Sequence, residues 1–421
     1  MNVTIKKAPS KGIVDIPSSK SLCHRAIIAA SLACGVSKIS NITFSKDIEA
    51  TIMAMSACGA KMERDGNTLI ITGSMVRRVY DQIDCNESGS TIRFMIPIAL
   101  VCDAPITFTG KNNLVNRPLD PFFEIFDNQN IEYERKDAYL PLKVNSGLKS
   151  GIFKIRGDIS SQFITGLLFA LPLLKGDSKI IITTNLESKG YIDLTLDVLK
   201  TFGIDIINND YKEFIIKGNQ EYMPHDYNVE GDFSQAAFFL VANCLGANFN
   251  LRMMDMNSHQ GDKKILKDLE DFGANITYKD SILSCNANEL KGATIDFSQS
   301  PDLGPALTVL AALSNGRSDF INASRLRIKE CDRITCMKNE LEKLGANIEE
   351  LPDGMIIYGV NSLHGGIVDS CNDHRVAMAI AMASLKCDGE IKILNASCVS
   401  KSFPHFWKVF ESLGGVLEYE E

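Results

Sequence analysis

One short pattern recurs six times along this chain and limits what it can fold into. An apolar, helix-like stretch ends at a glycine or asparagine, and a strand-like stretch follows at once. The clearest copy reads Phe272-Gly273-Ala274-Asn275-Ile276. Self-similarity at a spacing of roughly 70 residues indicates repeated structural units. The six equivalent positions are Gly59, Asn128, Gly203, Gly273, Gly345 and Gly414.

The unit between residues 231 and 300 shows the pattern in full. Asp232 is a predicted N-cap of the first helix, and Gly273 ends the second helix in the left-handed conformation, where a side chain is penalised. Apolar residues of the second helix fall on one face. The predicted order is β-α-β-α-β-β, with helices over 232–245 and 262–272 and later strands over 247–251, 275–278 and 282–285.

The first helix of each unit is apolar on nearly every side, so it is predicted to be buried. A chain of 421 residues is too long for one ordinary core. We therefore predict an α/β fold of two domains, each built from three repeated βαβαββ units with buried inner helices. The periodicity fades between residues 218 and 232, where we expect a domain break. The predicted inner helices cover 26–32, 92–101, 163–174, 236–245, 303–313 and 376–385.

Bulk composition limits the possible partners. The net charge is −8, with 45% hydrophobic and 23% charged residues, which is typical of a globular protein. A negatively charged average surface repels nucleic acid and anionic lipid. We therefore expect no nucleic-acid or membrane partner. Small anionic ligands remain compatible with the chain wherever its basic residues gather.

Cysteine and histidine patterns point to no metal or redox site. The twelve cysteines include no CxxC pair, so we predict buried, reduced thiols in a cytosolic protein. The histidines form no HxxH or HExxH pattern, so we predict no metal site and no cofactor. Met1–Lys7 lacks the apolar stretch of a signal peptide, and the longest apolar run, Ile164–Leu174, is too short to span a bilayer. A cytoplasmic location is expected.

Basic residues stand at several predicted helix starts, where the helix dipole disfavours a cation by about 0.3–1 kcal/mol. A single such residue is most simply a solvated surface residue. Their recurrence favours another interpretation, because free backbone N–H groups and a cation together bind phosphate or carboxylate. Converging from two domains, they would form a positive cleft for multiply anionic substrates. These residues are Lys20, Arg25, Arg93, Arg117, Lys329, Arg333, Arg375 and Lys401.

Polar residues at other helix starts have two interpretations. Ser160, Ser161 and Gln162 open one helix, where N-capping explains one serine and leaves spare donors for substrate oxygens. The segment Ser188-Lys189-Gly190-Tyr191 is similar, and capping is the simpler explanation. Asp302 is either an N-cap or a functional acid. Glu330 is either half of a surface ion pair or a carboxyl group that exchanges a proton in a cationic pocket.

Together these segments resemble the 3-phosphoshikimate 1-carboxyvinyltransferase family, also called 5-enolpyruvylshikimate-3-phosphate synthases. The resemblance runs through nearly the whole chain in the family's order. Each motif alone is weak, but the joint match is specific. The motifs are Lys20-Ser21-x-x-His24-Arg25, Ser88-Gly89-Ser90-x-x-Arg93, Arg117-Pro118, Ser160-Ser161-Gln162, Lys329-Glu330-x-Asp332-Arg333, Asp373-His374-Arg375 and Ser400-Lys401-x-Phe403-Pro404.

This resemblance implies an enolpyruvyl transferase-like inside-out α/β barrel. The N-terminal strand then joins the C-terminal domain, giving one domain over 1–15 and 230–421, a central domain over 16–229, and an active site in the cleft between them. It implies transfer of the enolpyruvyl group of phosphoenolpyruvate to the 5-hydroxyl of shikimate 3-phosphate through a tetrahedral intermediate, in chorismate and aromatic amino-acid biosynthesis. It also implies a monomer without cofactor or metal.

The resemblance assigns roles residue by residue. Asp302, Glu330 and Lys20 would be catalytic, with Glu330 protonating the methylene carbon of phosphoenolpyruvate and Asp302, helped by Lys20, taking the hydroxyl proton. Shikimate 3-phosphate would contact Lys20, Ser21, Arg25, Ser160, Ser161, Gln162, Ser188, Tyr191, Asp302 and Lys329. Phosphoenolpyruvate would contact Lys20, Gly89, Ser90, Arg117, Gln162, Arg333, His374, Arg375 and Lys401.

Four positions depart from the family pattern: Glu87, Phe94, Arg325 and Cys331. They bear on affinity and on sensitivity to the inhibitor glyphosate, whereas retention of Gly89 favours a sensitive site.

Two rival functions remain. One is enolpyruvyl transfer to UDP-N-acetylglucosamine. The transferases with that activity carry a cysteine motif in a loop, and this chain has no cysteine between Gly110 and Arg117. The other is non-catalytic binding of a phosphorylated metabolite on the same scaffold, which the intact Lys20, Asp302, Glu330 and Lys401 disfavour.

Overall fold

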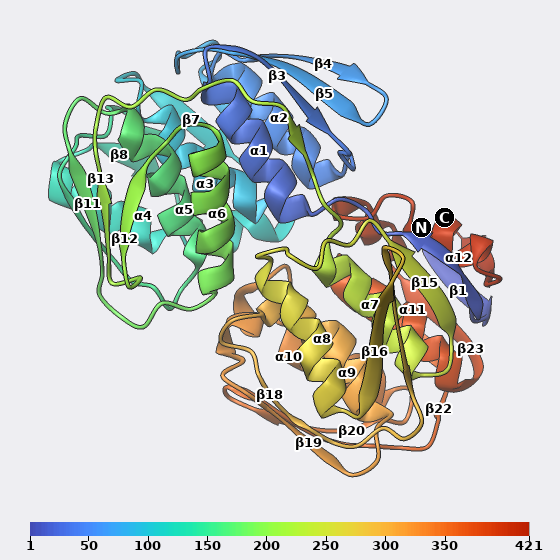
Figure 1. Ribbon diagram of the computed structural model, residues 1–421. Helices are drawn as coiled ribbons and strands as arrows, with labels where there is room; N and C mark the ends of the chain where they lie inside the picture. Colours follow the sequence, from blue (N-terminus) through green and yellow to red (C-terminus); the bar gives the residue numbers. More distant parts are fainter. Residues whose placement is uncertain (421) are drawn as a thin grey trace. The chain divides into compact units, whose positions relative to one another are not determined.

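A computed structural model describes residues 1–420 and divides the chain into two compact units. Unit 1 contains Met1–Pro17 and the chain from Glu230 onward, and unit 2 contains Ser18–Val229. Each unit holds three four-stranded sheets and its own hydrophobic core. The predicted α/β fold of repeated units with buried inner helices is therefore confirmed (Figure 1).

The sheets share one pairing pattern, which the third sheet of unit 2 illustrates. Strand β10 (Ile152–Ile155) pairs in parallel with β11 (Ser178–Ile182). The remaining neighbours are antiparallel: β11 pairs with β13 (Glu213–Ile216), and β13 pairs with β12 (Ile206–Asn209). A helix connects the parallel strands, and a second helix leads to the antiparallel pair. This is the predicted βαβαββ order.

Unit 2 contains six α-helices around which its three sheets are built. The inner helices are α1 (Lys20–Leu32), α3 (Gly89–Ala99) and α5 (Ser161–Ala170), and the outer helices are α2 (Lys46–Ala57), α4 (Asp120–Gln129) and α6 (Lys189–Thr201). The other strands are β3 (Gly35–Ser40), β4 (Lys61–Asp65), β5 (Thr68–Gly73), β6 (Gln82–Asp84), β7 (Ile106–Thr109), β8 (Tyr133–Arg135), β9 (Leu142–Val144) and β14 (Tyr227–Asn228).

Unit 1 repeats the arrangement. Its inner helices are α7 (Phe233–Cys244), α9 (Gly304–Ala312) and α11 (His374–Ala383), and its outer helices are α8 (Ile265–Asp271), α10 (Arg333–Glu342) and α12 (Phe406–Ser412). Its strands are β1 (Asn2–Lys7), β2 (Lys11–Asp15), β15 (Asn248–Arg252), β16 (Ala274–Lys279), β17 (Ile282–Ala287), β18 (Thr294–Asp296), β19 (Arg317–Ile321), β20 (Asn347–Leu351), β21 (Gly354–Tyr358), β22 (Leu363–Asp369), β23 (Cys387–Leu394) and β24 (Val416–Glu420).

Strands near the two crossings do not pair with the elements that follow them in sequence. β2 directly precedes α1 but pairs in parallel with β15 of unit 1. β14 precedes α7 but pairs in parallel with β3 of unit 2. β1 lies between β23 and β24 in the last sheet, so strands from both ends of the chain share that sheet.

The inner helices carry the cores. All residues of α7, α9 and α11 are buried, and Figure 1 shows α7 and α9 enclosed among the strands of their unit. Burial on every side matches their uniformly apolar sequences, because a helix exposed on one face carries polar residues there. Each inner helix begins at the end of a strand, so its first turn is where side chains can point out of the core.

The repeated turn agrees with prediction except in one copy. Gly59, Gly203, Gly273, Gly345 and Gly414 all have positive φ, which allows the tight exit from the helix. In the second copy, Asn128 lies inside α4, and Asn130 is the left-handed cap, with φ 53°. The prediction of Asn128 was wrong because asparagine also tolerates this conformation, and two candidates stood two residues apart.

The prediction of reduced cysteines is also wrong for one pair. Cys336 and Cys371 form a disulfide, with Cα atoms 6.7 Å apart across 35 residues of sequence. The other ten cysteines are free. The spacing along the chain carries no signal for this pair, because the fold itself brings α10 beside the end of β22. Within residues 1–420, no helix has the length and apolar character needed to cross a membrane.

Candidate active site

In unit 2, a buried arginine connects two helix starts. Arg25 on α1 is 2% exposed and donates to the backbone oxygens of Ser21 at 2.7 Å and Tyr191 at 2.9 Å. Its Nε donates to Thr195 Oγ1 at 2.9 Å. Burial lowers the pKa of Arg25 to about 10. Ser21, Arg25 and Tyr191, predicted to bind the same substrate, therefore lie together.

Lys20, at the first position of α1, pairs with a carboxylate from the next helix. Its Nζ lies 2.9 Å from Oδ2 of Asp47 on α2, and both side chains are largely buried. The side chain of Ser19 caps α1 by accepting from the Leu22 N–H. The cap leaves Lys20 at the helix start, where its side chain pairs with the Asp47 carboxylate.

Gln162 links the first turns of two inner helices. From α5, its Oε1 accepts from Arg93 Nη1 and its Nε2 donates to Ser90 Oγ, each at 2.8 Å. Ser90 and Arg93 belong to the first turn of α3, one helical turn apart. The oxygen and the nitrogen of the Gln162 amide are thereby both oriented, and Ser90 and Gln162 are in direct contact.

Gly89 and Arg117 form a second close contact at the start of α3. A Cβ atom on Gly89 would lie 2.5 Å from Nη1 and 2.8 Å from the central carbon of the Arg117 guanidinium. Arg117 follows the short 3-10 helix Asn112–Asn116 and is buried. The absence of a side chain at position 89 is therefore what allows this guanidinium to lie against the helix start.

The structure tests the capping interpretation of the serines at two helix starts. Ser160 caps α5 by accepting from the Gln162 N–H at 3.3 Å. Ser161 is buried in the first turn of the same helix. Ser188 occupies the N-cap position of α6, but it adopts a left-handed conformation with φ 56°, and its side chain makes no capping hydrogen bond. Capping, the simpler explanation of Ser188, is therefore wrong.

In unit 1, one carboxylate is bound by three cations. Asp302 lies in the short 3-10 helix Pro301–Leu303 before α9, so it is not the N-cap of that helix. Its Oδ1 lies 3.2 Å from Lys329 Nζ and 3.0 Å from Arg333 Nη1, and its Oδ2 lies 3.0 Å from Arg375 Nη2. Three positive partners stabilise the ionised carboxylate and fix the direction of both of its oxygens.

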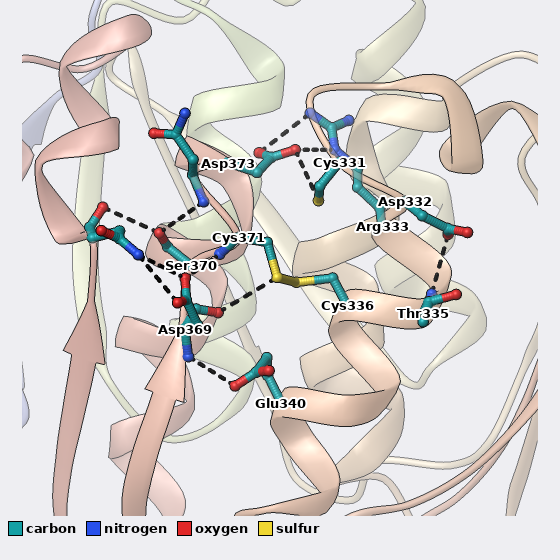
Figure 2. The surroundings of a disulfide bond; sticks show 12 residues. Cys331, Asp332, Arg333, Thr335, Cys336, Glu340, Asp369, Ser370, Cys371 and Asp373 are labelled. Atoms are coloured by element: carbon teal, nitrogen blue, oxygen red, sulfur yellow. Dashed lines mark hydrogen bonds and ion pairs between the residues drawn. A yellow bond between two sulfur atoms is a disulfide. The ribbon is translucent and has the colours of Figure 1, made fainter. Parts of the chain in front are cut away.

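Arg333, at the start of α10, is the centre of this cluster. It is 1% exposed and donates to Glu330 Oε2 at 2.8 Å, besides Asp302. It also donates to Asp373 Oδ2 at 2.8 Å (Figure 2). Burial alone disfavours the charge, but the three carboxylates raise the pKa of Arg333 well above its usual value. Glu330 is thus not a surface ion pair, because its partner is a buried guanidinium.

Three more predicted residues stand at the start of α11 and before α12. Arg375 also donates to Ser234 Oγ at 3.1 Å. Lys401 Nζ donates to the backbone oxygen of Asn372 at 2.8 Å, and Lys401 is buried. His374 is buried in the same first turn of α11, with its Nδ1 3.9 Å from Asp373 Oδ1.

Burial changes the acid–base behaviour of Lys329. It lowers the pKa of Lys329 to about 8, against the opposing effect of the Asp302 carboxylate, and Arg325 and Arg333 lower it further. The positive charge predicted for this part of the site is largely balanced in unit 1, since Asp302, Glu330 and Asp373 lie among the cations. A guanidinium as buried as Arg333 requires such partners.

The basic residues on which the sequence interpretation depends are thus not on open surface. Arg117, Arg333, Arg375 and Lys401 are buried, and Lys20 is nearly so. Within residues 1–420, no group of three or more His, Cys, Asp or Glu side chains is placed to hold a metal ion.

Sequence reasoning did not predict the partners that hold three site residues in place. Asp47 pairs with Lys20, Arg93 with Gln162, and Asp373 with Arg333. Arg93 and Asp373 fall inside recognised motifs and were within reach. Asp47 carried no usable signal, because an acid in the first turn of a helix is ordinary.

Comparison with known proteins identifies the family. The family model described as EPSP synthase (3-phosphoshikimate 1-carboxyvinyltransferase) matches residues 5–410. The chain belongs to the EPSP synthase family. Proteins named 3-phosphoshikimate 1-carboxyvinyltransferase from Clostridium novyi and Clostridium perfringens are 52% and 53% identical to it, covering 99% of this chain and 98% and 99% of their own. The one from Clostridioides difficile is 51% identical, with 99% and 98% covered.

Two solved structures share the fold of this chain. An EPSP synthase from Acinetobacter baumannii superimposes with a TM-score of 0.82 at 23% identity, with 100% of both chains covered. The enolpyruvyl transferase NikO from Streptomyces tendae gives 0.81 at 14% identity, with 100% of this chain and 98% of its own covered. These two likenesses bear on architecture, whereas the full-length relatives bear on the family.

Proposed function

We propose that this chain is a 3-phosphoshikimate 1-carboxyvinyltransferase, which transfers the enolpyruvyl group of phosphoenolpyruvate to the 5-hydroxyl of shikimate 3-phosphate and releases phosphate. The chain belongs to a family of that activity, and relatives above 50% identity along nearly its whole length carry that name. The observation that carries the assignment at the level of chemistry is the Asp302 carboxylate, fixed by three cations beside Glu330.

For shikimate 3-phosphate, the polar starts of three helices in unit 2 supply a suitable set of groups. Arg25 and the Ser160–Ser161 pair offer a guanidinium, hydroxyls and N–H groups of a helix N-terminus, which suit a phosphate. Ser21 and Tyr191 lie against Arg25. Lys329 of unit 1 adds a second cation, and Ser188 and Gln162 add polar groups for the ring hydroxyls.

For phosphoenolpyruvate, both units contribute donors. In unit 2, Gly89 leaves room beside Arg117, and Gln162 orients Ser90. In unit 1, the candidates are Arg333, His374, Arg375 and Lys401. Arginine favours planar, bidentate contact with carboxylate and phosphate groups, both of which this substrate carries. We propose that the two clusters act on one bound pair of substrates.

The reaction follows as addition and then elimination. Glu330 gives a proton to the methylene carbon of phosphoenolpyruvate, and the 5-oxygen of the acceptor bonds to the adjacent carbon. The hydroxyl proton passes to Asp302, helped by Lys20. Elimination takes a proton back from the new methyl group and breaks the carbon–oxygen bond to phosphate, restoring the double bond. Positioned acids and bases contribute about 10²–10⁴-fold, and fixed charges stabilise the developing cation.

A phosphate-release assay tests the assignment. Purified protein is given phosphoenolpyruvate with shikimate 3-phosphate, with UDP-N-acetylglucosamine, or with neither acceptor. Release only with shikimate 3-phosphate is expected. Release with the nucleotide sugar would make the chain the other enolpyruvyl transferase, and binding without release would make it a metabolite-binding protein.

Location and assembly are separate proposals. We propose that the enzyme works in the cytoplasm, where both substrates of a biosynthetic enzyme are made, and that it is a monomer, as the family resemblance implies. Light scattering coupled to size-exclusion chromatography, read against the chain mass of 46.3 kDa, tests the second point.

Gly89→Ala is expected to weaken phosphoenolpyruvate binding and, more strongly, glyphosate inhibition. A methyl group cannot occupy the 2.5 Å between that position and Arg117 Nη1, so the guanidinium must move. Overpacking of this kind costs about 1–3 kcal/mol, which corresponds to a rise in KM for phosphoenolpyruvate of roughly 5- to 150-fold. Steady-state kinetics with glyphosate measures both constants. Unchanged values of both constants would mean that the Arg117 guanidinium can move aside without loss of binding.

Lys329 gives the reaction an alkaline limit. The charged ammonium is present below its pKa of about 8 and is lost as pH rises through that value. KM for the phosphorylated acceptor is therefore expected to rise above that pH. Lys329→Arg keeps its charge throughout, since a guanidinium has a pKa above about 12. This variant should lose the alkaline rise, while Lys338→Arg on the same segment should retain it. An unchanged profile in Lys329→Arg would assign the limit to another group.

A further inference from the structure

The Cys336–Cys371 disulfide lies directly behind the cationic cluster of unit 1. Cys336 is on α10, one turn after Arg333, and Cys371 is in the loop between β22 and α11, two residues before Asp373. In Figure 2 the two sulfur atoms join the helix to this loop, with Arg333 and Asp373 beside them. The cross-link therefore connects the two segments that carry the most buried ion pair of the site.

Three contacts between these segments form a ladder. Residues 333, 336 and 340 share one face of α10, because residues three and four apart line up on a helix. Arg333 binds Asp373 at 2.8 Å, Cys336 is bonded to Cys371, and Glu340 Oε2 accepts from the Asp369 N–H at 2.7 Å. The loop partners 369, 371 and 373 alternate along the chain. The disulfide is the middle and only covalent rung of this ladder.

The loop that the disulfide holds also positions other site groups. Cys371 and Asn372 both have positive φ, at 51° and 54°. The backbone oxygen of Asn372 accepts from Lys401, and the Asp373 carboxylate caps α11 at the Arg375 N–H. A shift of this loop would therefore change the positions of Arg333, Arg375 and Lys401, the cations assigned to phosphoenolpyruvate.

We propose that Cys336 and Cys371 are a reversible thiol–disulfide pair that sets how tightly the enzyme binds phosphoenolpyruvate, with the disulfide form holding the cations in place. The proposal rests on the proposed function of this cluster. Breaking the bond removes one rung and leaves the ion pair and the Glu340 contact intact. We therefore expect weaker binding of one substrate and a protein that stays folded.

Exchange with a dithiol accounts for every atom and electron. A thiolate of the dithiol attacks Sγ of Cys371, the less buried of the two residues, and expels the Cys336 thiolate. The second thiol of the reagent, as thiolate, then attacks the reagent's other sulfur, which is bonded to Cys371 in the mixed disulfide. This attack expels the Cys371 thiolate. Two electrons pass to the protein, both protein thiolates take up protons, and the reagent leaves as a cyclic disulfide.

A thiol count establishes the starting state. The protein, purified without reductant, is unfolded in urea, alkylated with iodoacetamide and weighed by mass spectrometry. Ten alkylated cysteines are expected, and twelve after treatment with dithiothreitol. Peptide mapping should assign the two additional sites to Cys336 and Cys371. Twelve alkylated cysteines before reduction would overturn the proposal.

Kinetics of the two forms test the effect on binding. Reduction is expected to raise KM for phosphoenolpyruvate by roughly 5- to 50-fold, because displacement of a positioning group by about 1 Å can cost up to about 10²-fold. KM for shikimate 3-phosphate should change by less than about twofold, because the loop holds cations that are assigned to the other substrate. The Cys336→Ser/Cys371→Ser double variant should match the reduced enzyme with or without dithiothreitol. Cys34→Ser, which removes an exposed free thiol, should respond like the unmodified enzyme.

Cys331 offers a readout that does not depend on turnover. Its Sγ lies 3.8 Å from Asp373 Oδ2, and burial raises the pKa of this thiol, so it reacts slowly while the loop is held. Reduction, and the double serine variant, should speed its alkylation in the folded protein severalfold. Equal Cys331 reactivity and equal KM in the two redox forms would overturn the proposal. Absence of turnover in both forms, with Cys331 still responding, would instead contradict the proposed function.

Discussion

Asp302→Asn is expected to lower kcat by about 10²–10⁴-fold, the usual contribution of a positioned acid or base. The amide has nearly the same shape as the carboxylate but cannot accept the hydroxyl proton of the acceptor. It also removes the negative charge to which Lys329, Arg333 and Arg375 bind at 3.0–3.2 Å. The three cations remain available to anionic substrates, so KM should change far less than kcat.

Asp296→Asn is the matched control for this variant. Asp296 precedes the same 3-10 helix and accepts hydrogen bonds from the Ser298 N–H and from Asn322, away from the cationic cluster. Its replacement should leave kcat within about twofold, as expected for a change outside the machinery. Retention of more than a tenth of kcat by Asp302→Asn would remove Asp302 from the role of base.

Arg333→Met should destabilise unit 1 more than any other single change to the site. Arg333 is buried and binds the carboxylates of Asp302, Glu330 and Asp373. Removing one partner of a buried charge pair leaves the other uncompensated, which costs about 3–5 kcal/mol. Urea unfolding monitored by circular dichroism measures this loss. Activity should also fall, because the carboxylates lose the group that orients them.

Arg327→Met separates this effect from the loss of any arginine. Arg327 lies six residues before the start of α10 and binds Asp332 and Glu350, each at 2.8 Å, but it remains partly exposed to solvent. Water screens such pairs, so the expected loss is at most about 1 kcal/mol. Equal destabilisation by the two variants would mean that the burial of Arg333 does not decide its contribution.

Periodicity sufficed to predict the repeats, because the helix and strand pattern of each unit is present in its own local sequence. The exit glycines are an example: a positive φ is required at Gly273 and its equivalents, and few other residues meet it. The same reasoning failed for Asn128, because the residue that adopts the left-handed conformation in that copy is Asn130. Local patterns are reliable where a single residue type satisfies the local geometry.

Contacts between distant segments were beyond such patterns. The sequence suggested that Lys20 and Arg333 matter, but not that Asp47 holds one and Asp373 the other. Cys336 and Cys371 are 35 residues apart, and only the placement of α10 beside the loop after β22 joins them. Partners of this kind are set by tertiary packing, which no spacing rule along the chain expresses.

The position of β1 between β23 and β24 has a consequence for biosynthesis. β1 is synthesised long before its neighbours β23 and β24. It therefore stays unpaired until most of the chain has been translated. Ser18–Val229 needs no later segment to complete its own sheets and can condense while translation continues. In a polypeptide that ends before β24, unit 2 can therefore be complete, whereas unit 1 lacks the strand that pairs with one edge of β1.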